Sequence, residues 1–205
     1  MGRALVALLV TSLVAATGCA TSDFMTPAHH PCCAAPPETE ALVVFIRPDS
    51  MAQGTLVTLM DEHLAFLGEL GPQSCFATTV AAGPNLFVGW SENTSVLDAD
   101  LLAGHTYFVE VTAGLGAISA RAQLFSVREG RRLDAKVLGW LSDCTFLEAD
   151  VERGQAWIDA HHDEARRRLR DAREALSRYR GQDLDVRTLR PSDGRLELRT
   201  RPSSR

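Results

Sequence analysis

The chain has 205 residues, of which 45% are hydrophobic and 6% aromatic, and its formal net charge is −5. This length and composition can bury one sizeable core, built mostly from Val, Leu and Ala, with an appendage beside it. Nucleic-acid-binding proteins usually carry a basic surface, so this mildly acidic chain is not expected to have a nucleic-acid partner.

Residues 1–18 have the organisation of a bacterial lipoprotein signal peptide. Arg3 gives a positive start, and the apolar stretch 4–16 is too short for a permanent membrane-spanning helix. It ends at Ala16-Thr17-Gly18-Cys19, which resembles a lipobox, so we predict that Cys19 is acylated and becomes the first residue of the mature chain. The alternative is an ordinary secretory signal, because the general signal peptidase also accepts Ala16-x-Gly18.

Acylation of Cys19 would make the lipid bilayer a partner and the bacterial cell envelope the location. No later stretch approaches the ~20 apolar residues that a spanning helix needs, so the acyl chains would be the only anchor. Ala20 follows the cysteine, and the absence of Asp there favours the outer membrane, with the protein facing the periplasm.

Residues 19–40 are rich in Pro and Ala and show no apolar periodicity, so we predict a disordered tether. The tether contains His29-His30-Pro31-Cys32-Cys33, whose side chains are metal-ligand types. Adjacent cysteines lack the two-residue gap that lets ligands converge on a tetrahedral ion. We therefore expect neither a metal nor a cofactor.

Residues 41–128 alternate short apolar runs with turn-forming residues such as Gly71-Pro72 and Ala103-Gly104. Turns every eight to twelve residues are typical of a β-sandwich. We predict a small antiparallel β-sandwich of the immunoglobulin or transthyretin type, followed by C-terminal α-helices. The predicted strands are 42–47, 55–60, 65–70, 74–80, 85–91, 95–101, 105–112 and 119–128.

Four motifs stand in this region: Val44-Phe45-Ile46-Arg47-Pro48, a turn started by Asp61, Ala82-Gly83-Pro84-Asn85, and Ala103-Gly104-His105-Thr106-Tyr107-Phe108-Val109. Together they resemble the bacterial lipoproteins of domain-of-unknown-function family 2846. The chain departs from that pattern with Glu62-His63 where Gly-Lys is usual, and with Asn85 where His is usual. The resemblance implies a small sandwich on a lipid tether and implies no known activity, so no catalytic residue is carried over.

Residues 129–180 are predicted to be a helical segment, with one short amphipathic helix over 131–141 and a longer one over 150–180. Asp150 is the expected N-cap of the long helix, which we expect to dock on the sandwich through its apolar seam. The alternative is pairing with a partner protein or with a second copy through this helix. Residues 181–205 are polar and are predicted to be a frayed tail.

Charge is divided between the sheet and the long helix. Residues 41–128 carry eight acidic and three basic side chains, whereas residues 161–180 carry seven arginines and four acids. Arg166, Arg167, Arg170 and Arg173 are candidate contacts to an anionic partner, such as the phosphates of lipid headgroups. The alternative, which the helical spacing favours, is a solvated face on which the arginines pair with nearby acids of the same helix.

No catalytic arrangement is predicted, and we expect a structural or binding module rather than an enzyme. One alternative is glycan or small-molecule binding by the sandwich loops, which an exposed aromatic platform near Trp90 would support. A second alternative is a hydrolase using Asp98, Asp100 and His105, which flank one hairpin. Because Asp98 and Asp100 alternate with apolar residues, the polar face of a strand explains them more simply.

Cys75 and Cys144 are predicted to form a disulfide. The envelope outside the cytoplasmic membrane is oxidising, and both cysteines fall in segments expected to be ordered. Pairings of either cysteine with Cys32 or Cys33 remain open as rivals.

Overall fold

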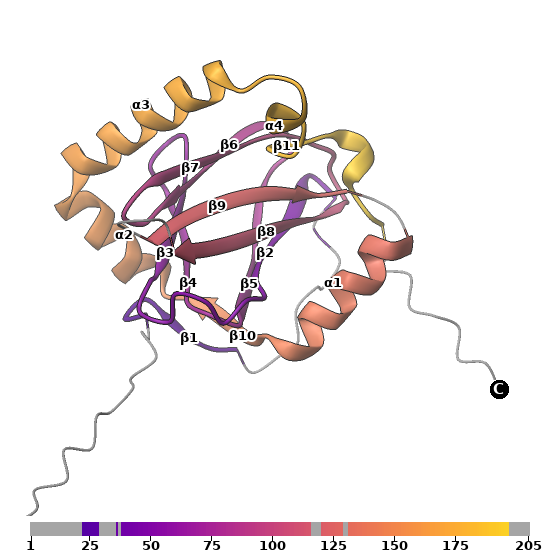
Figure 1. The fold of residues 1–205 in the computed structure, drawn as a ribbon, viewed down its shortest axis with the longest axis horizontal. Helices are drawn as coiled ribbons and strands as arrows, with labels where there is room; N and C mark the ends of the chain where they lie inside the picture. The colour runs from indigo at the N-terminus through magenta and orange to yellow at the C-terminus, as the bar shows by residue number, and fades with distance from the viewer. Residues whose placement is uncertain (1–21, 29–35, 37, 116–119, 129–130, 197–205) are drawn as a thin grey trace, which may run out of the picture.

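The computed structural model describes residues 22–28, 36, 38–115, 120–128 and 131–196 (Figure 1). The fold is mainly β with C-terminal helices, as predicted, and two sheets pack face to face. In the described part of the chain, one sheet has six strands, in the spatial order β1 (Met25–Pro27), β10 (Thr145–Ala149), β5 (Ser74–Ala81), β2 (Glu40–Arg47), β8 (Thr106–Leu115) and β9 (Ala120–Val127). The other has five, in the order β11 (Thr188–Leu189), β7 (Thr94–Leu101), β6 (Gly83–Trp90), β3 (Val57–Asp61) and β4 (Phe66–Leu70).

Both sheets are mixed, which corrects the expectation of an antiparallel sandwich. Strands β2 to β9 match the eight predicted strands, but β2 runs parallel to β8, with Leu42 opposite Thr106. Strands β10 and β11 also run parallel to their neighbours β5 and β7. Each of these pairs joins strands that are distant in sequence, which is the condition that allows parallel pairing. Periodicity in a strand indicates which face is buried and not which way the neighbouring strand runs.

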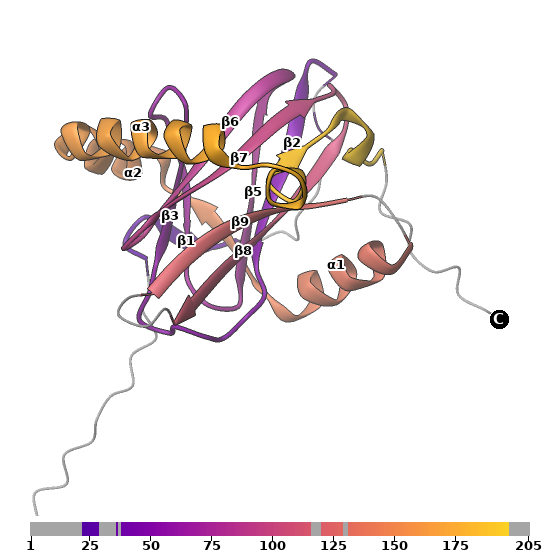
Figure 2. The same cartoon turned by 45° about the horizontal axis from the view of Figure 1, so that its top comes forward.

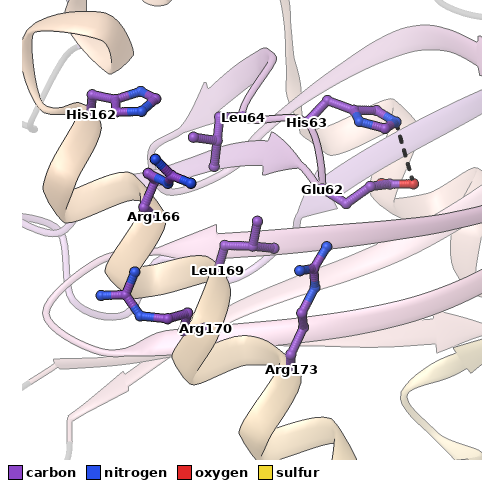
Figure 3. A pocket seen from close by; sticks show the side chains of 8 residues that line it. All are labelled: Glu62, His63, Leu64, His162, Arg166, Leu169, Arg170 and Arg173. Atoms are coloured by element: carbon purple, nitrogen blue, oxygen red, sulfur yellow. Dashed lines mark ion pairs between the residues drawn. The ribbon is translucent and has the colours of Figure 1, made fainter.

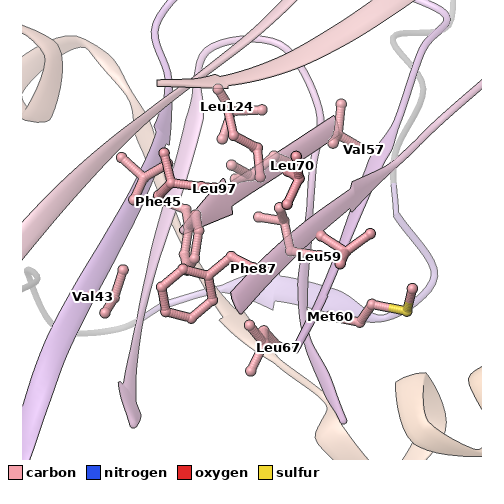
Figure 4. Packing of buried hydrophobic residues seen from close by; sticks show 14 of the residues in the cluster. Val43, Phe45, Val57, Leu59, Met60, Leu67, Leu70, Phe87, Leu97 and Leu124 are labelled. Carbon is pink, nitrogen blue, oxygen red and sulfur yellow. The ribbon is translucent and has the colours of Figure 1, made fainter. Parts of the chain in front are cut away.

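Strand β2 is central and buried on both faces, as its continuous apolar run indicates. Phe45 faces the core between the sheets, where its ring lies 5.3 Å from that of Phe76 and 5.4 Å from that of Phe87 in the opposite sheet (Figure 4). Val44 and Ile46 face the other way, into a second cluster that includes Val137. Val137 belongs to α1 (Arg131–Asp143), so this helix covers the outer face of the six-stranded sheet.

Part of the predicted disordered tether is folded. Met25 of β1 is only 8% exposed and belongs to the main core, and β1 pairs antiparallel with β10. The ring of Phe24 lies 5.8 Å from that of Phe66 and 5.9 Å from that of Trp157. The tether prediction is therefore wrong for residues 22–28, because two neighbouring apolar residues in a Pro- and Ala-rich stretch produce no periodicity.

The predicted tail is also folded as far as residue 196. It contains α4 (Gln182–Asp185), β11 and a short 3-10 helix, η1 (Pro191–Asp193). Leu189 is fully buried against the five-stranded sheet, and the backbone of Arg195 bridges to that of Thr106. The polar composition of the segment did not indicate this packing, because the segment is held by single buried residues such as Leu189.

The long predicted helix is two helices, α2 (Val151–Ala160) and α3 (His162–Arg178), separated at His161. Asp150 is the N-cap of α2, as predicted, and its carboxylate accepts a hydrogen bond of 3.1 Å from the Arg153 backbone N–H. Ala165 and Ala172 of α3 are fully buried in the main core, which confirms that the helix docks on its own sandwich. Figure 2 shows α3 lying across the five-stranded sheet.

Helix α2 approaches the sheet closely at Gly154. A Cβ atom at this position would lie 2.2 Å from the ring of Phe66 in β4, a separation that no side chain tolerates. Glycine is therefore needed for α2 to lie at its observed distance from the sheet. Among the described helices, none has the length and apolarity required to cross a membrane.

Candidate functional site

A basic hollow lies between α3 and the turn that joins β3 to β4 (Figure 3). Its volume is about 510 Å³. The turn contributes Glu62, His63 and Leu64, and α3 contributes His162, Arg166, Leu169, Arg170 and Arg173. We call this feature the arginine groove.

The groove's three arginines share one side of α3 because they are spaced four and three residues apart. The seam beside them holds the helix on the sheet through the buried Ala165 and Ala172. In Figure 3, Arg166 and Arg173 extend from α3 toward the turn, and Arg170 is turned along the outside of the helix. The helix therefore presents Arg166 and Arg173 beside the apolar side chains of Leu64 and Leu169, with Arg170 at the outer rim of the groove.

The opposite wall is a turn whose conformation is fixed by Asp61. Its Oδ1 accepts hydrogen bonds of 2.8 Å from the backbone N–H groups of His63 and Ala65. Leu64 has a φ of 66°, in the left-handed region that non-glycine residues rarely adopt. Gln155 of α2 attaches the turn to the helical layer, since its Nε2 donates to the Leu64 carbonyl across 3.2 Å.

The arginines of α3 fall into two sets. Arg168 Nε lies 2.8 Å from Glu164 Oε1, and Arg167 pairs with the same carboxylate. Arg166, Arg170 and Arg173 form no ion pair with any carboxylate in the part of the chain that the structure describes. The paired-face alternative thus holds for Arg167 and fails for the three groove arginines.

Glu164 illustrates the electrostatic effect of such pairing. Desolvation alone would raise the pKa of its carboxyl group. Hydrogen bonds from Arg168 and Arg167 outweigh this and hold the pKa below its ordinary value. A carboxylate or phosphate placed among the unpaired arginines would experience the same attraction.

The carboxylate of Glu62, which lines the groove, contacts groups other than the groove arginines. Its Oε2 accepts a hydrogen bond of 2.9 Å from the Leu86 backbone N–H, and its Oε1 lies 3.9 Å from His63 Nε2. The carboxylate therefore stabilises the turn against β6. It leaves the guanidinium donors of α3 available to bind an anion through charge-assisted hydrogen bonds.

The structure does not bring the predicted hydrolase residues together. On β7, Asp98 is half-buried and Asp100 is exposed. Desolvation raises the pKa of Asp98, and the charge of Asp100 adds to this rise. A hydrogen bond from the Ala99 backbone acts in the opposite direction. His105 Nδ1 lies 2.8 Å from the carbonyl of Ala103. Among the described residues, no hydrogen bond or ion pair links His105 to either aspartate.

Trp90 is not an open aromatic platform. Its half-buried ring lies 4.7 Å from the ring of Trp157 in α2, and the guanidinium of Arg168 lies 5.5 Å from its centre. The ring of Trp157 in turn lies 4.4 Å from that of His161, tilted by 32°. These contacts assign Trp90 to the docking of the helices on the sheet.

Cys75 and Cys144 are brought together, and both are free thiols. The parallel register of β10 and β5 places Phe146 opposite Cys75, so Cys144 lies diagonally across from it. Cys75 Sγ donates to the Thr145 carbonyl at 3.9 Å, and Cys144 Sγ donates to the Arg47 carbonyl at 3.8 Å. The neighbouring Cys144 thiol, together with burial, raises the pKa of Cys75, and the neighbouring Cys75 thiol lowers the pKa of Cys144. The disulfide itself stays a prediction. Cys19, Cys32 and Cys33 lie outside the described residues.

The sequence analysis did not connect the other groove residues with the arginines; these are Glu62, His63, Leu64, His162 and Leu169. No sequence pattern would have found them, because the turn and α3 meet only through the packing of α2 and α3 on the sheet.

No family model, curated protein or solved structure matches this chain. In the described residues, no cluster of three or more His, Cys, Asp or Glu side chains could hold a metal ion.

Proposed function

We propose that this chain is a lipid-anchored binding module of the bacterial cell envelope. The acylated Cys19 holds it on the membrane, and the arginine groove binds an anionic ligand. The lipobox-like sequence that ends at Cys19 supports the anchor. The two packed sheets of the described residues support a small sandwich. Because no family model matches the chain, this support comes from its own residues.

One observation carries the choice of binding site: Arg166, Arg170 and Arg173 lack a described carboxylate partner. Like charges at this helical spacing repel one another. A bound anion would remove this repulsion and gain hydrogen bonds to charged donors, each contributing about 1.5–3 kcal/mol. The rest of the sandwich carries an excess of acids, so the groove is the surface to which an anion is drawn.

The glycan and hydrolase alternatives receive no comparable support. The ring of Trp90 is covered by Trp157 and Arg168, and His105 bonds within its own turn.

Isothermal titration with tripolyphosphate tests the proposal. The mature chain, residues 19–205, is used with Cys19→Ser, so that no acyl chain is attached and every described residue is retained. Tripolyphosphate should bind, and the triple variant Arg166→Gln/Arg170→Gln/Arg173→Gln should weaken binding by at least about tenfold.

The matched control is Arg167→Gln/Arg178→Gln, which removes arginines of the same helix that pair with Glu164 and Glu174. This control should bind as the parent does. No binding by the parent, or an equal loss in both variants, would reject the groove as the site.

A further inference from the structure

We propose that the anion recognised by the arginine groove is the phosphate of lipid headgroups in the same bilayer that holds the anchor. The folded domain would then lie with α3 against the membrane. This inference rests on the proposed function, because it requires both the acylated Cys19 and an anion-binding groove.

The first argument is the short connection between the anchor and the fold. Phe24 is packed against Phe66 and Trp157, and the backbone N–H of Asp150 donates to the Phe24 carbonyl across 2.8 Å. Only residues 20–23 separate Phe24 from Cys19. Even fully extended, this connection spans at most about 17 Å. The domain is therefore held close to the bilayer surface.

The second argument is the side of the domain from which the connection leaves. Phe24 touches Trp157, which lies 4.4 Å from the ring of His161. His162 follows directly and lines the groove. The other wall of the groove is also close to Phe24, because Phe24 packs on Phe66, two residues after Leu64 of the turn.

The third argument is charge. Anionic headgroups repel a sandwich with eight acidic and three basic side chains, and attract the unpaired Arg166, Arg170 and Arg173. Because the anchor already holds the domain at the surface, contact between groove and headgroup becomes an intramolecular step with a high effective concentration. Individually weak phosphate contacts are then sufficient to orient the domain.

Co-sedimentation with vesicles tests this inference. The probes are vesicles of phosphatidylcholine alone and of phosphatidylcholine mixed with phosphatidylglycerol, and the protein is residues 19–205 with Cys19→Ser. Without acyl chains, retention reports only the protein surface. The chain should bind the anionic vesicles and not the neutral ones, and binding should weaken as salt is added.

The groove variant Arg166→Gln/Arg170→Gln/Arg173→Gln should bind the anionic vesicles about 100-fold more weakly, and Arg167→Gln/Arg178→Gln should bind as the parent does. If the triple variant fails to fold, the three exposed single variants are compared instead, each with an expected loss of about fivefold. Equal binding by parent and groove variants would overturn the inference.

Tripolyphosphate titration separates the two levels of the proposal. Binding of tripolyphosphate without binding of anionic vesicles would support the anion-binding groove and contradict its contact with lipid headgroups. Binding of neither probe would contradict both the anion-binding groove and the membrane contact.

Discussion

Arg195 donates from Nε to Oδ1 of Asp134 across 2.7 Å, joining the last described stretch of the chain to the first turn of α1. Both side chains are buried, and the guanidinium also donates to the carbonyl of Arg128 and lies over the ring of Phe108. The pair thus closes the sandwich at the edge where helix α1, strand β8 and the C-terminal segment meet.

Removing the acid of this pair should strongly destabilise the fold. Asp134→Ala leaves a buried guanidinium without its counter-charge, which costs about 3–5 kcal/mol. We expect Tm to fall by roughly 6–12 °C or more in a calorimetric scan. Lys136→Ala, on the same helix as Asp134, removes an exposed ion pair with Glu110 of β8 and should cost no more than about 1 kcal/mol. Similar losses in the two variants would contradict a structural role for the buried pair.

Cys75 and Cys144 should be linked in protein isolated from an oxidising envelope. Exchange with an oxidant disulfide would convert the two thiols to one disulfide and release two thiols from the oxidant. Closing a loop of about 70 residues stabilises the fold by about 4 kcal/mol in the chain-entropy model. Non-reducing peptide mapping should recover the linked peptide, and recovery of both cysteines as free thiols would contradict the pairing.

The same pair makes a prediction for the reduced protein. Cys144 is half-exposed and its pKa is lowered by the neighbouring Cys75 thiol, whereas Cys75 is buried and its pKa is raised. Iodoacetamide should therefore modify Cys144 first, because the thiolate is the reactive form. Mass spectrometry of a time course measures the order.

Gly154 and Gly139 form a matched pair of helix glycines with opposite expected effects. Gly154→Ala places a methyl group against the ring of Phe66 and should destabilise the fold by about 1–3 kcal/mol. Gly139 has no neighbouring atom within 4 Å of an added Cβ, so Gly139→Ala should stabilise α1 by about 0.5–1 kcal/mol. Denaturant unfolding measures both changes, and a neutral Gly154→Ala would mean that α2 can move away from the sheet.

The anchor is tested by fractionating cells. Cys19→Ser should leave the precursor without acyl chains and move the protein from the membrane fraction to the soluble fraction. Metabolic labelling with palmitate should mark the parent and not the variant. A parent that already fractionates as a soluble periplasmic protein would contradict the lipoprotein assignment.

The sandwich was predictable because its strands carry strong local patterns. Strand β2 is apolar throughout, and turn formers such as Gly104, with its φ of 71°, mark the strand ends. Docking of α3 was also predictable, since Ala165 and Ala172 repeat at helical spacing on its buried face.

Pairings between distant segments were not predictable, because they depend on tertiary contacts. Strand β1 is held in place by pairing with β10, and Phe24 just before it packs on the ring of Phe66; β11 is held in place by pairing with β7. The groove has the same origin: helical spacing predicts an arginine face on α3, but the turn that joins β3 to β4 reaches that face only in the folded chain.

The pairing of Met25 with Ala149 also fixes an order of events during folding. A chain that emerges from a translocation channel with its N-terminus first exposes β1 long before its partner, about 120 residues later, has emerged. Contacts of such large sequence separation form late because loop closure precedes them. Before β10 arrives, β1 has no partner strand. If Cys19 is acylated as proposed, pairing of β1 with β10 would draw the domain toward the membrane surface. In a refolding experiment followed by hydrogen exchange, the amides of β1 should therefore be among the last to gain protection.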